Sequence, residues 1–208
     1  LVVAGAFVLD SDLQIRGGRS MMSMPDDVER AESEPITIDD AFRAGLRPIV
    51  TAYLALQKAL VADDLPASKK GYETLAAAVL AFQPRSPNEA RLVWKPISSR
   101  LRDHAERGAG SASLVAARRT FEQVSLPLIS ALRRFGNPLE TTVRLAECPM
   151  AIDKRTASWL QTDEAVKNPY WGSKMLDCGS IRSQTKSGDH LDTEAHTHDK
   201  PAAPEKKP

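Results

Sequence analysis

The feature that most constrains this chain is a run of apolar residues at helical spacing between residues 37 and 136. In the segment TIDDAFRAGLRPIVTAYLALQKALVADD, apolar side chains recur at alternating intervals of four and three residues: Phe42, Leu46, Ile49, Tyr53, Leu56 and Leu60. Because a helix turns once every 3.6 residues, this spacing is typical of a helix packed in a bundle. Thr37 is the expected N-cap, with Asp40 in the first turn.

Three further helices are expected. The second follows Asp64, the third starts at the capping box SPNE with Pro87 at its first position, and the fourth starts at Ser111 or Ser113 and ends at Gly136. Their expected inward residues are Tyr72, Leu75, Val79 and Phe82; Ala90, Val93, Ile97 and Leu101; and Leu114, Ala117, Phe121, Val124, Leu128, Ala131 and Phe135. Short polar connections between four such helices predict a mainly α protein, an antiparallel four-helix bundle over residues 37–136.

Prolines leave one question open within these helices. Pro48, Pro96 and Pro127 each fall inside an apolar period, and a proline inside a helix removes a backbone hydrogen bond. The sequence does not decide whether they bend long helices or divide them.

Composition changes on both sides of the predicted bundle. Residues 1–15 are β-branched and apolar, which predicts a short strand, and residues 16–36 hold Gly, Ser, Met and acids without a period, which predicts a linker. Residues 137–179 mix aromatics with Pro, Gly and sulfur, so we expect a small irregular cap on the bundle. Residues 180–208 are charged and rich in proline, which predicts a disordered tail that contains His190, His196 and His198.

Charge and hydropathy exclude some classes of function. The net charge of +1, without a strongly basic tract, argues against a nucleic-acid partner. No run approaches the roughly 18 apolar residues of a membrane span. The first ten residues lack the basic start of a signal peptide, and the chain begins with Leu1, so we interpret it as a fragment or a trimmed chain.

Sulfur is concentrated in the predicted cap. Beyond residue 24 the chain has two cysteines and two methionines, and all four lie in ECPMA and NPYWGSKMLDCG. Cys148 and Met150 are two apart, which places them on one face of an extended strand, and Met175 and Cys178 are three apart, which aligns them on a turn or helix. Two thiols and two thioethers form a soft donor set that suits Cu(I) or Ag(I), while thiolates also suit Zn(II). The spacing is not that of a zinc ribbon.

Two other interpretations of the same residues stay open. In an oxidising compartment Cys148 and Cys178 would form a disulfide, with Met150 and Met175 packed against the aromatics, or the two thiols would be buried and free. A catalytic thiol is the least favoured interpretation, because His104 is the only histidine in the predicted folded part and lies on a polar helix face. Met21, Met22 and Met24, and the tail histidines, are weaker metal candidates for which packing and solvation are the simpler explanations.

A family resemblance rests on several short motifs. The segment LVVAGAFVLDSDLQIRGGRSMMSMP resembles the end of the membrane-proximal domain in periplasmic adaptors (membrane fusion proteins) of heavy-metal RND efflux systems. The matching positions are Gly5, Phe7, Val8, Leu9, Asp10, Ser11, Met21, Met22 and Pro25. The motifs CPMA, WLQ, NPYWG and MLDCG, in that order, resemble a helical domain of unknown function appended to the C-terminus of some such adaptors. Nothing resembles the lipoyl domain or the helical hairpin of an adaptor.

The resemblance implies a periplasmic setting at the inner membrane and a non-enzymatic role in copper or silver export. It implies as partners an RND pump, an outer-membrane channel and a soft metal ion. The implied metal ligands are Cys148, Met150, Met175 and Cys178, and the implied loop-shaping residues are Asn168, Pro169, Tyr170 and Gly172. The alternative is a structural or protein-interaction module closed by a Cys148–Cys178 disulfide, with no metal.

Overall fold

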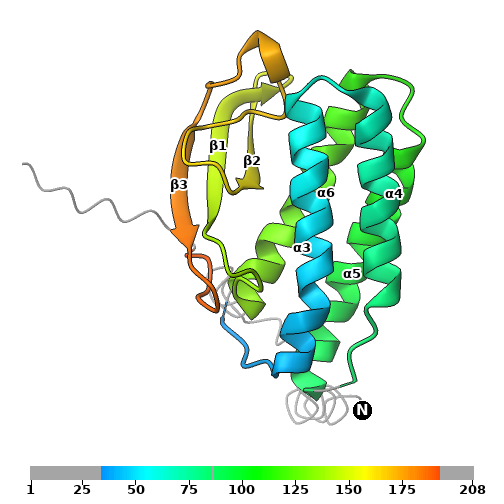
Figure 1. The fold of residues 1–208 in the computed structure, drawn as a ribbon, viewed down its shortest axis with the longest axis vertical. Helices are drawn as coiled ribbons and strands as arrows, with labels where there is room; N and C mark the ends of the chain where they lie inside the picture. The colour runs from blue at the N-terminus through cyan, green and yellow to red at the C-terminus, as the bar shows by residue number, and fades with distance from the viewer. Residues whose placement is uncertain (1–33, 86, 193–208) are drawn as a thin grey trace, which may run out of the picture. The chain divides into compact units, whose positions relative to one another are not determined.

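The computed structural model describes residues 34–85 and 87–192, and it contains the predicted four-helix bundle. The helices are α3 (Asp40–Val61), α4 (Leu65–Ala81), α5 (Asn88–Ala109) and α6 (Leu114–Phe135). Each helix packs against the next along the chain, and short connections join them (Figure 1). A three-stranded sheet lies beside α3 and α6, on the side away from α4 and α5 (Figure 1).

Polar side chains cap three of the four helix starts. Asp39 Oδ1 accepts a hydrogen bond from the Phe42 N–H at 2.7 Å, so the cap of α3 is Asp39 and not the predicted Thr37. Asp64 caps α4 through the Ala67 N–H at 2.9 Å, and Ser113 caps α6. An aspartate two residues nearer the apolar run reaches the free N–H groups of the first turn, which explains the shift.

The remaining helix ends follow backbone preferences. Pro87 is the N-cap of α5 and makes no side-chain hydrogen bond, so the helix starts one residue later than the predicted capping box requires. Gly136 ends α6 as predicted, with a φ of 77° that residues with a Cβ rarely adopt.

The three internal prolines do not divide their helices. Pro48, Pro96 and Pro127 each lie inside a continuous helix of 22 residues. Pro48 and Pro96 are exposed, so water can satisfy the carbonyl that each proline leaves without a partner.

An aromatic cluster fills one part of the bundle core. Phe42 lies 5.1 Å from Phe82 and 4.9 Å from Phe135 between ring centroids, and Trp94 packs 5.4 Å from Phe82. Trp94 is only 2% exposed, whereas Val93, the predicted inward residue of α5, is half-buried. Ala90, Ile97 and Leu101 are buried as predicted, so the inward stripe of α5 differs from the prediction at one position, where the tryptophan buries more apolar area than the valine.

The segment predicted as an irregular cap contains two strands of a β-sheet and an irregular loop. The strands of this sheet are β1 (Val143–Ile152), β2 (Arg155–Gln161) and β3 (Ser180–Thr185), in the order β2-β1-β3 with both pairs antiparallel. The sheet thus follows the helices. β3 extends into the segment predicted as disordered tail, and that prediction is wrong for residues 180–192. The sequence SIRSQT resembles a tail because only Thr185 of this edge strand is buried, while Ser180, Arg182 and Gln184 are exposed.

The chain after β3 packs back onto the end of α6. The Leu191 N–H donates to the Leu132 carbonyl at 3.2 Å, and the Leu191 side chain is 3% exposed. Asn137, fully buried, donates through Nδ2 to the carbonyl oxygens of Thr141 and Thr185. Ile36, placed in the predicted linker, is 5% exposed and also packs in this core.

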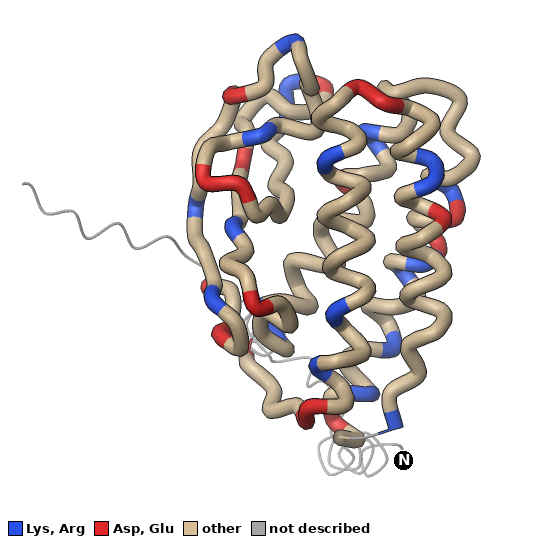
Figure 2. Tube along the Cα trace, viewed as in Figure 1, with Lys and Arg blue, Asp and Glu red and all other residues tan. Residues whose placement is uncertain are grey.

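Several predictions concern residues outside the described ranges. The strand at 1–15, residues 16–33 of the linker with Met21, Met22 and Met24, and residues 193–208 with His196 and His198 lie there. Within the described ranges, no helix has the length and apolar character needed to cross a membrane. Basic and acidic positions are interspersed over the helices and the sheet (Figure 2).

Candidate functional site

The two cysteines, thirty residues apart in sequence, lie side by side in the structure. Cys148 on β1 is fully buried and Cys178 precedes β3, and their Sγ atoms are 3.1 Å apart with both thiols free. Gly179 makes this approach possible. It has a φ of 128°, and a Cβ there would lie 2.5 Å from the Glu147 carbonyl oxygen. A glycine after Cys178 therefore allows its loop to close onto β1.

The contact between the thiols changes the acidity of Cys178. The hydrogen bond with Cys148, then partial burial, then the charge of the neighbouring sulfur raise the pKa of the Cys178 thiol above its usual value. The thiol form of Cys178 is therefore favoured at neutral pH, and a reaction that needs the thiolate must first remove a proton.

The two methionines lie at the surface of the same module. Met150 is 47% exposed and Met175 is 40% exposed, so neither thioether is a packed core residue. The pairing of β1 with β2 is irregular between Cys148 and Ile152, and both Pro149 and Met150 are exposed after the buried Cys148. The regular alternation used to place Cys148 and Met150 on one face does not hold in this stretch.

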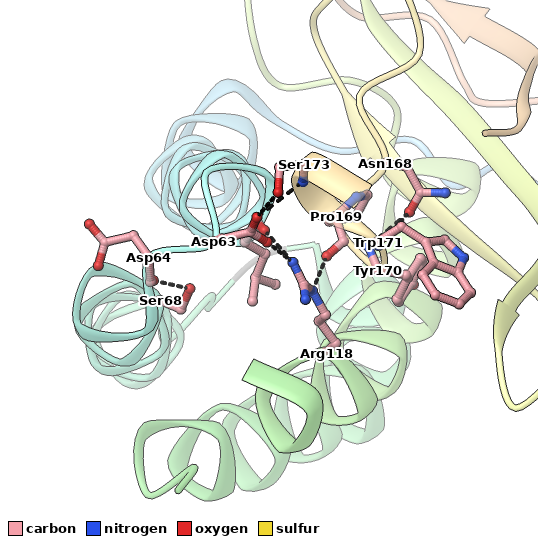
Figure 3. Close-up of polar contacts among 10 residues, drawn as sticks. Asp63, Asp64, Ser68, Arg118, Asn168, Pro169, Tyr170, Trp171 and Ser173 are labelled. Atoms are coloured by element: carbon pink, nitrogen blue, oxygen red, sulfur yellow. Dashed lines mark hydrogen bonds and ion pairs between the residues drawn. The ribbon is translucent and has the colours of Figure 1, made fainter. Parts of the chain in front are cut away.

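Asn168 organises the loop that carries Cys178. Its side chain is fully buried, and its Oδ1 accepts hydrogen bonds from the N–H groups of Tyr170 at 2.8 Å and Trp171 at 3.2 Å. Its Nδ2 donates to the Cys178 carbonyl at 2.7 Å, and its backbone N–H donates to the Leu176 carbonyl. One side chain thus fixes both ends of the loop from 168 to 178, and Figure 3 shows its contacts with Tyr170 and Trp171.

The aromatic residues of the loop attach it to the sheet and to α6. The Tyr170 hydroxyl donates to the Ser158 carbonyl at 3.0 Å, and its ring packs 5.7 Å from Phe121. The Trp171 indole N–H donates to the Met150 carbonyl at 3.1 Å. The loop therefore contacts the backbone of the strand segment that follows Cys148.

A second anchor, not predicted from the sequence, joins the loop to the helices (Figure 3). Arg118 of α6 forms an ion pair with Asp63 and donates through Nε to the Pro169 carbonyl at 2.8 Å. The second carboxylate oxygen of Asp63 accepts from the backbone N–H and the hydroxyl of Ser173, at 3.1 and 2.5 Å. The Asp63 carboxylate thus links the α3–α4 turn, α6 and the loop.

The backbone around this anchor is tightly restricted. Gly172 is buried with a φ of 57°, and a Cβ there would overlap Asp63 and Arg118. The hydrogen bond from the Ser173 hydroxyl is the largest cause that lowers the pKa of the Asp63 carboxyl; burial opposes it, and the contacts with Arg118 and the Ser173 N–H lower the pKa further. The available signal in the sequence is the Asp63–Asp64 pair between two helices. Asp64 caps α4, so the Asp63 carboxylate is not needed for the cap and can bind Arg118 and Ser173.

The donor set limits the chemistry of this site. Among residues 34–85 and 87–192, no group of three or more His, Cys, Asp or Glu side chains is placed to hold a metal ion. His104 contacts Arg107, and His190 contacts the Arg133 carbonyl at the end of α6. In the described ranges neither cysteine hydrogen-bonds to a histidine, so a Cys–His pair of the kind used by thiol enzymes is not formed there.

One family model matches part of the chain. Residues 49–139, which run from the middle of α3 to just beyond α6, match a family described as a protein of unknown function, DUF3347. No curated protein and no solved structure matches the chain. The matched region includes Asp63 and Arg118, whereas both cysteines and the sheet lie outside it.

Proposed function

We propose that this chain is a non-enzymatic accessory domain of a periplasmic adaptor in RND-type heavy-metal efflux, and that it captures Cu(I) or Ag(I) as cargo. The motifs CPMA, NPYWG and MLDCG support the setting by their resemblance to the domain appended to such adaptors. The RND pump and the outer-membrane channel are its proposed partners. The observation that carries the proposal is the 3.1 Å contact between the sulfurs of Cys148 and Cys178.

The sulfur geometry allows a shared ion after a small movement. An ion bonded to both sulfurs at about 2.3 Å would hold them about 3.8 Å apart at a tetrahedral angle, and about 4.6 Å apart in a line. Cys148 is fixed in the core, whereas Cys178 is partly exposed on a loop. The adjustment of roughly 1 Å falls on Cys178, so capture would require the loop to shift outward.

The exposed thioethers give the proposed capture an entry route. Soft metal ions exchange between thioether and thiolate donors without a change of oxidation state. Met150 and Met175 keep 47% and 40% of their surface exposed, so both thioethers are accessible to an ion in solution. We assign them the role of first contacts, from which the ion passes to the buried Cys148 thiol and the partly exposed Cys178 thiol.

The competing function is an interaction module closed by a disulfide. Two free thiols in contact are also the arrangement from which a disulfide forms in an oxidising compartment. The absence of a third His, Cys, Asp or Glu donor from the described part of the chain favours this alternative. Such a bond would join β1 to the loop before β3. In the loop-entropy model this cross-link would stabilise the folded state by about 3–4 kcal/mol.

The deciding experiment is an intact-mass and free-thiol measurement on protein purified from an oxidising compartment. Metal capture predicts two thiols that alkylate under mild reductant and become protected by one equivalent of Ag(I). A mass lower by two hydrogens, unchanged by Ag(I) under mild reductant, would establish the disulfide and contradict metal capture.

Single replacements locate the ligands. Cys148→Ser and Cys178→Ser should each weaken the binding of Ag(I) in competition with a thiol chelator, because only one thiolate ligand remains. Leu80→Ala, at a 60% exposed position on α4, is a matched control that removes surface apolar area away from the sulfur and should leave uptake unchanged.

A further inference from the structure

Two adjoining cavities lie where α6 meets the turn between β1 and β2. The larger, of about 460 Å³, includes residues of α5, α6 and the turn, and the smaller, of about 210 Å³, reaches the loop that carries Cys178. Both are lined by Arg119, Ile152 and Asp153, so they form one groove that runs past the turn.

The two ends of the groove differ in chemistry. The larger cavity is lined mainly by charged groups, with His104, Arg107 and Arg155 among them. The smaller combines apolar groups, with Trp171 and Val115 among them, with charged ones such as Lys174, and Val115 is 62% exposed. A ligand that fills the whole groove must therefore carry both anionic and apolar groups.

The cations of the groove are only partly neutralised. Arg155 forms a two-point contact with Glu122 at 3.2 and 3.3 Å, and Arg119 pairs with Asp153 at 3.0 Å. Arg107, in the larger cavity, and Lys174, in the smaller, have no carboxylate within ion-pair distance in the ranges 34–85 and 87–192. The excess positive charge therefore lies toward the two ends, with a balanced Arg119–Asp153 pair between them.

The protonation state of the His104 imidazole does not change this distribution of charge. Partial burial, followed by the charge of Arg107, lowers the pKa of the His104 imidazole below its usual value. The imidazole is therefore neutral at pH 7, and the net charge of the groove there comes from the guanidinium groups and Lys174.

We infer that this groove binds an extended acidic segment of a partner protein, with a large apolar side chain seated against Trp171 and Val115 and carboxylates directed to Arg107 and Lys174. Two unpaired cations separated by an ion pair suit a few spaced carboxylates better than a dense polyanion, which would have to displace Glu122 and Asp153. The inference does not depend on metal capture, because neither cysteine lines the groove.

The groove adjoins the sulfur site through one residue. Trp171 lines the smaller cavity and its indole N–H holds the Met150 carbonyl. A segment bound against Trp171 would therefore contact the loop that carries Cys178. Binding at the groove should then change the environment of the two thiols. Figure 3 shows Trp171 on the anchored loop and Arg118 on α6, and both line this cavity.

The test is a titration of the full chain, isotope-labelled, with the synthetic peptide acetyl-Glu-Glu-Phe-Leu-Glu-Glu-amide, followed by NMR chemical shifts. We expect saturable shifts at the Trp171 indole, Val115 and Ile152, and weaker binding as salt rises. The double variant Arg107→Ser/Lys174→Ser should weaken binding at least fivefold. The control Arg91→Ser/Lys95→Ser removes two exposed cations from the first half of α5 and should leave the affinity unchanged.

Three outcomes would overturn the inference. The first is equal loss of affinity in both double variants, which would mean diffuse attraction to the whole surface. The second is undiminished binding of a peptide in which Ser replaces Phe and Leu, which would mean that the apolar end has no role. The third is binding to vesicles with a third of anionic lipid that the groove variant abolishes, while the peptide gives no shifts, which would make the groove a membrane contact.

Discussion

The bundle and the sheet module share one apolar core, and the module adds buried amides that each make several hydrogen bonds. The largest fully buried side chains of the helices are aromatic and aliphatic, with Phe42, Phe121 and Phe135 among them. The module that carries the cysteines also buries Asn168 and Gln161 completely. Gln161 accepts from the Trp159 indole and the Lys167 N–H and donates to the carbonyls of Asp163 and Ala165.

The two regions should therefore tolerate amino-acid substitutions differently. Apolar burial is not directional, so a bundle core accepts residues of similar size at many positions. A buried amide that satisfies three or four backbone groups is directional, and its loss leaves each of those groups without a partner. We therefore expect the stability of the bundle to depend on the volume of its core side chains. The stability of the module should depend on the presence of its buried amides.

The largest effect is expected from the aromatic core of the bundle. Phe42→Ala removes contacts with Phe82, Trp94 and Phe135 and should lower the free energy of unfolding by about 3–5 kcal/mol. Urea denaturation followed by far-UV circular dichroism measures this. Leu80→Ala, at an exposed position, should cost less than about 0.5 kcal/mol, and an equal loss in both variants would contradict a packed core at this end.

The second-largest effect is expected from the buried amides of the sheet module. Asn168→Ala leaves the Tyr170 and Trp171 N–H groups and the Cys178 carbonyl unpaired and should cost about 3 kcal/mol. The alkylation of Cys178 should become faster, because its loop is released, which iodoacetamide kinetics with peptide mapping can measure. Asn88→Ala, an exposed asparagine on α5, is the control. Unchanged alkylation in Asn168→Ala would mean that this amide does not hold the loop.

A smaller effect is expected where the two regions meet. Asp63→Asn weakens the anchor to Arg118 and Ser173 and should cost about 1 kcal/mol, reduced by partial solvent exposure. Because the folded carboxyl has a lowered pKa, its contribution is complete above the usual aspartate value of about 4 and is lost as the pH falls through the lower folded value.

The stability difference between the native chain and Asp63→Asn should therefore be full at pH 6 and shrink as the pH falls below 4. Urea denaturation at a series of pH values measures it. Asp103→Asn, on the exposed side of α5, should show no such difference. A pH-independent difference would show that the carboxylate charge is not what holds the loop.

The smallest effect on stability is expected at the exposed thioethers. Met150→Leu should change the free energy of unfolding by less than about 0.5 kcal/mol, because the side chain is 47% exposed. Under metal capture the same change should slow the uptake of Ag(I) severalfold, measured as the protection rate of the two thiols. Uptake at the native rate in Met150→Leu/Met175→Leu would leave the thioethers without a role in entry.

A pH series separates capture from simple adsorption of the ion. Because the pKa of the Cys178 thiol is raised, binding of Ag(I) must release its proton, and the affinity should rise as the pH is raised from 6 toward 8. Competition against a thiol chelator of known affinity measures this. An affinity that does not change with pH would place the ion on the thioethers alone.

The sequence alone determined the helical part of this protein. Apolar residues at intervals of three and four predicted four helices, with Gly136 at the end of the last one and Ser111 or Ser113 at its start, because helical periodicity and capping are local properties of the chain. The concentration of Cys148 and Cys178 in one module was also visible, since it needs only residue counts. The edge strand β3 was missed, because an exposed strand has the composition of a tail.

Which side chains meet became visible only in the folded chain. The 3.1 Å approach of Cys148 to Cys178 depends on a glycine with positive φ and on an amide ten residues away. The anchor that joins Asp63, Arg118 and Ser173 spans 110 residues of sequence and has no local pattern. Contacts of this kind depend on distance and direction between elements, which periodicity does not encode, so they become visible only when the helices and the sheet are packed together.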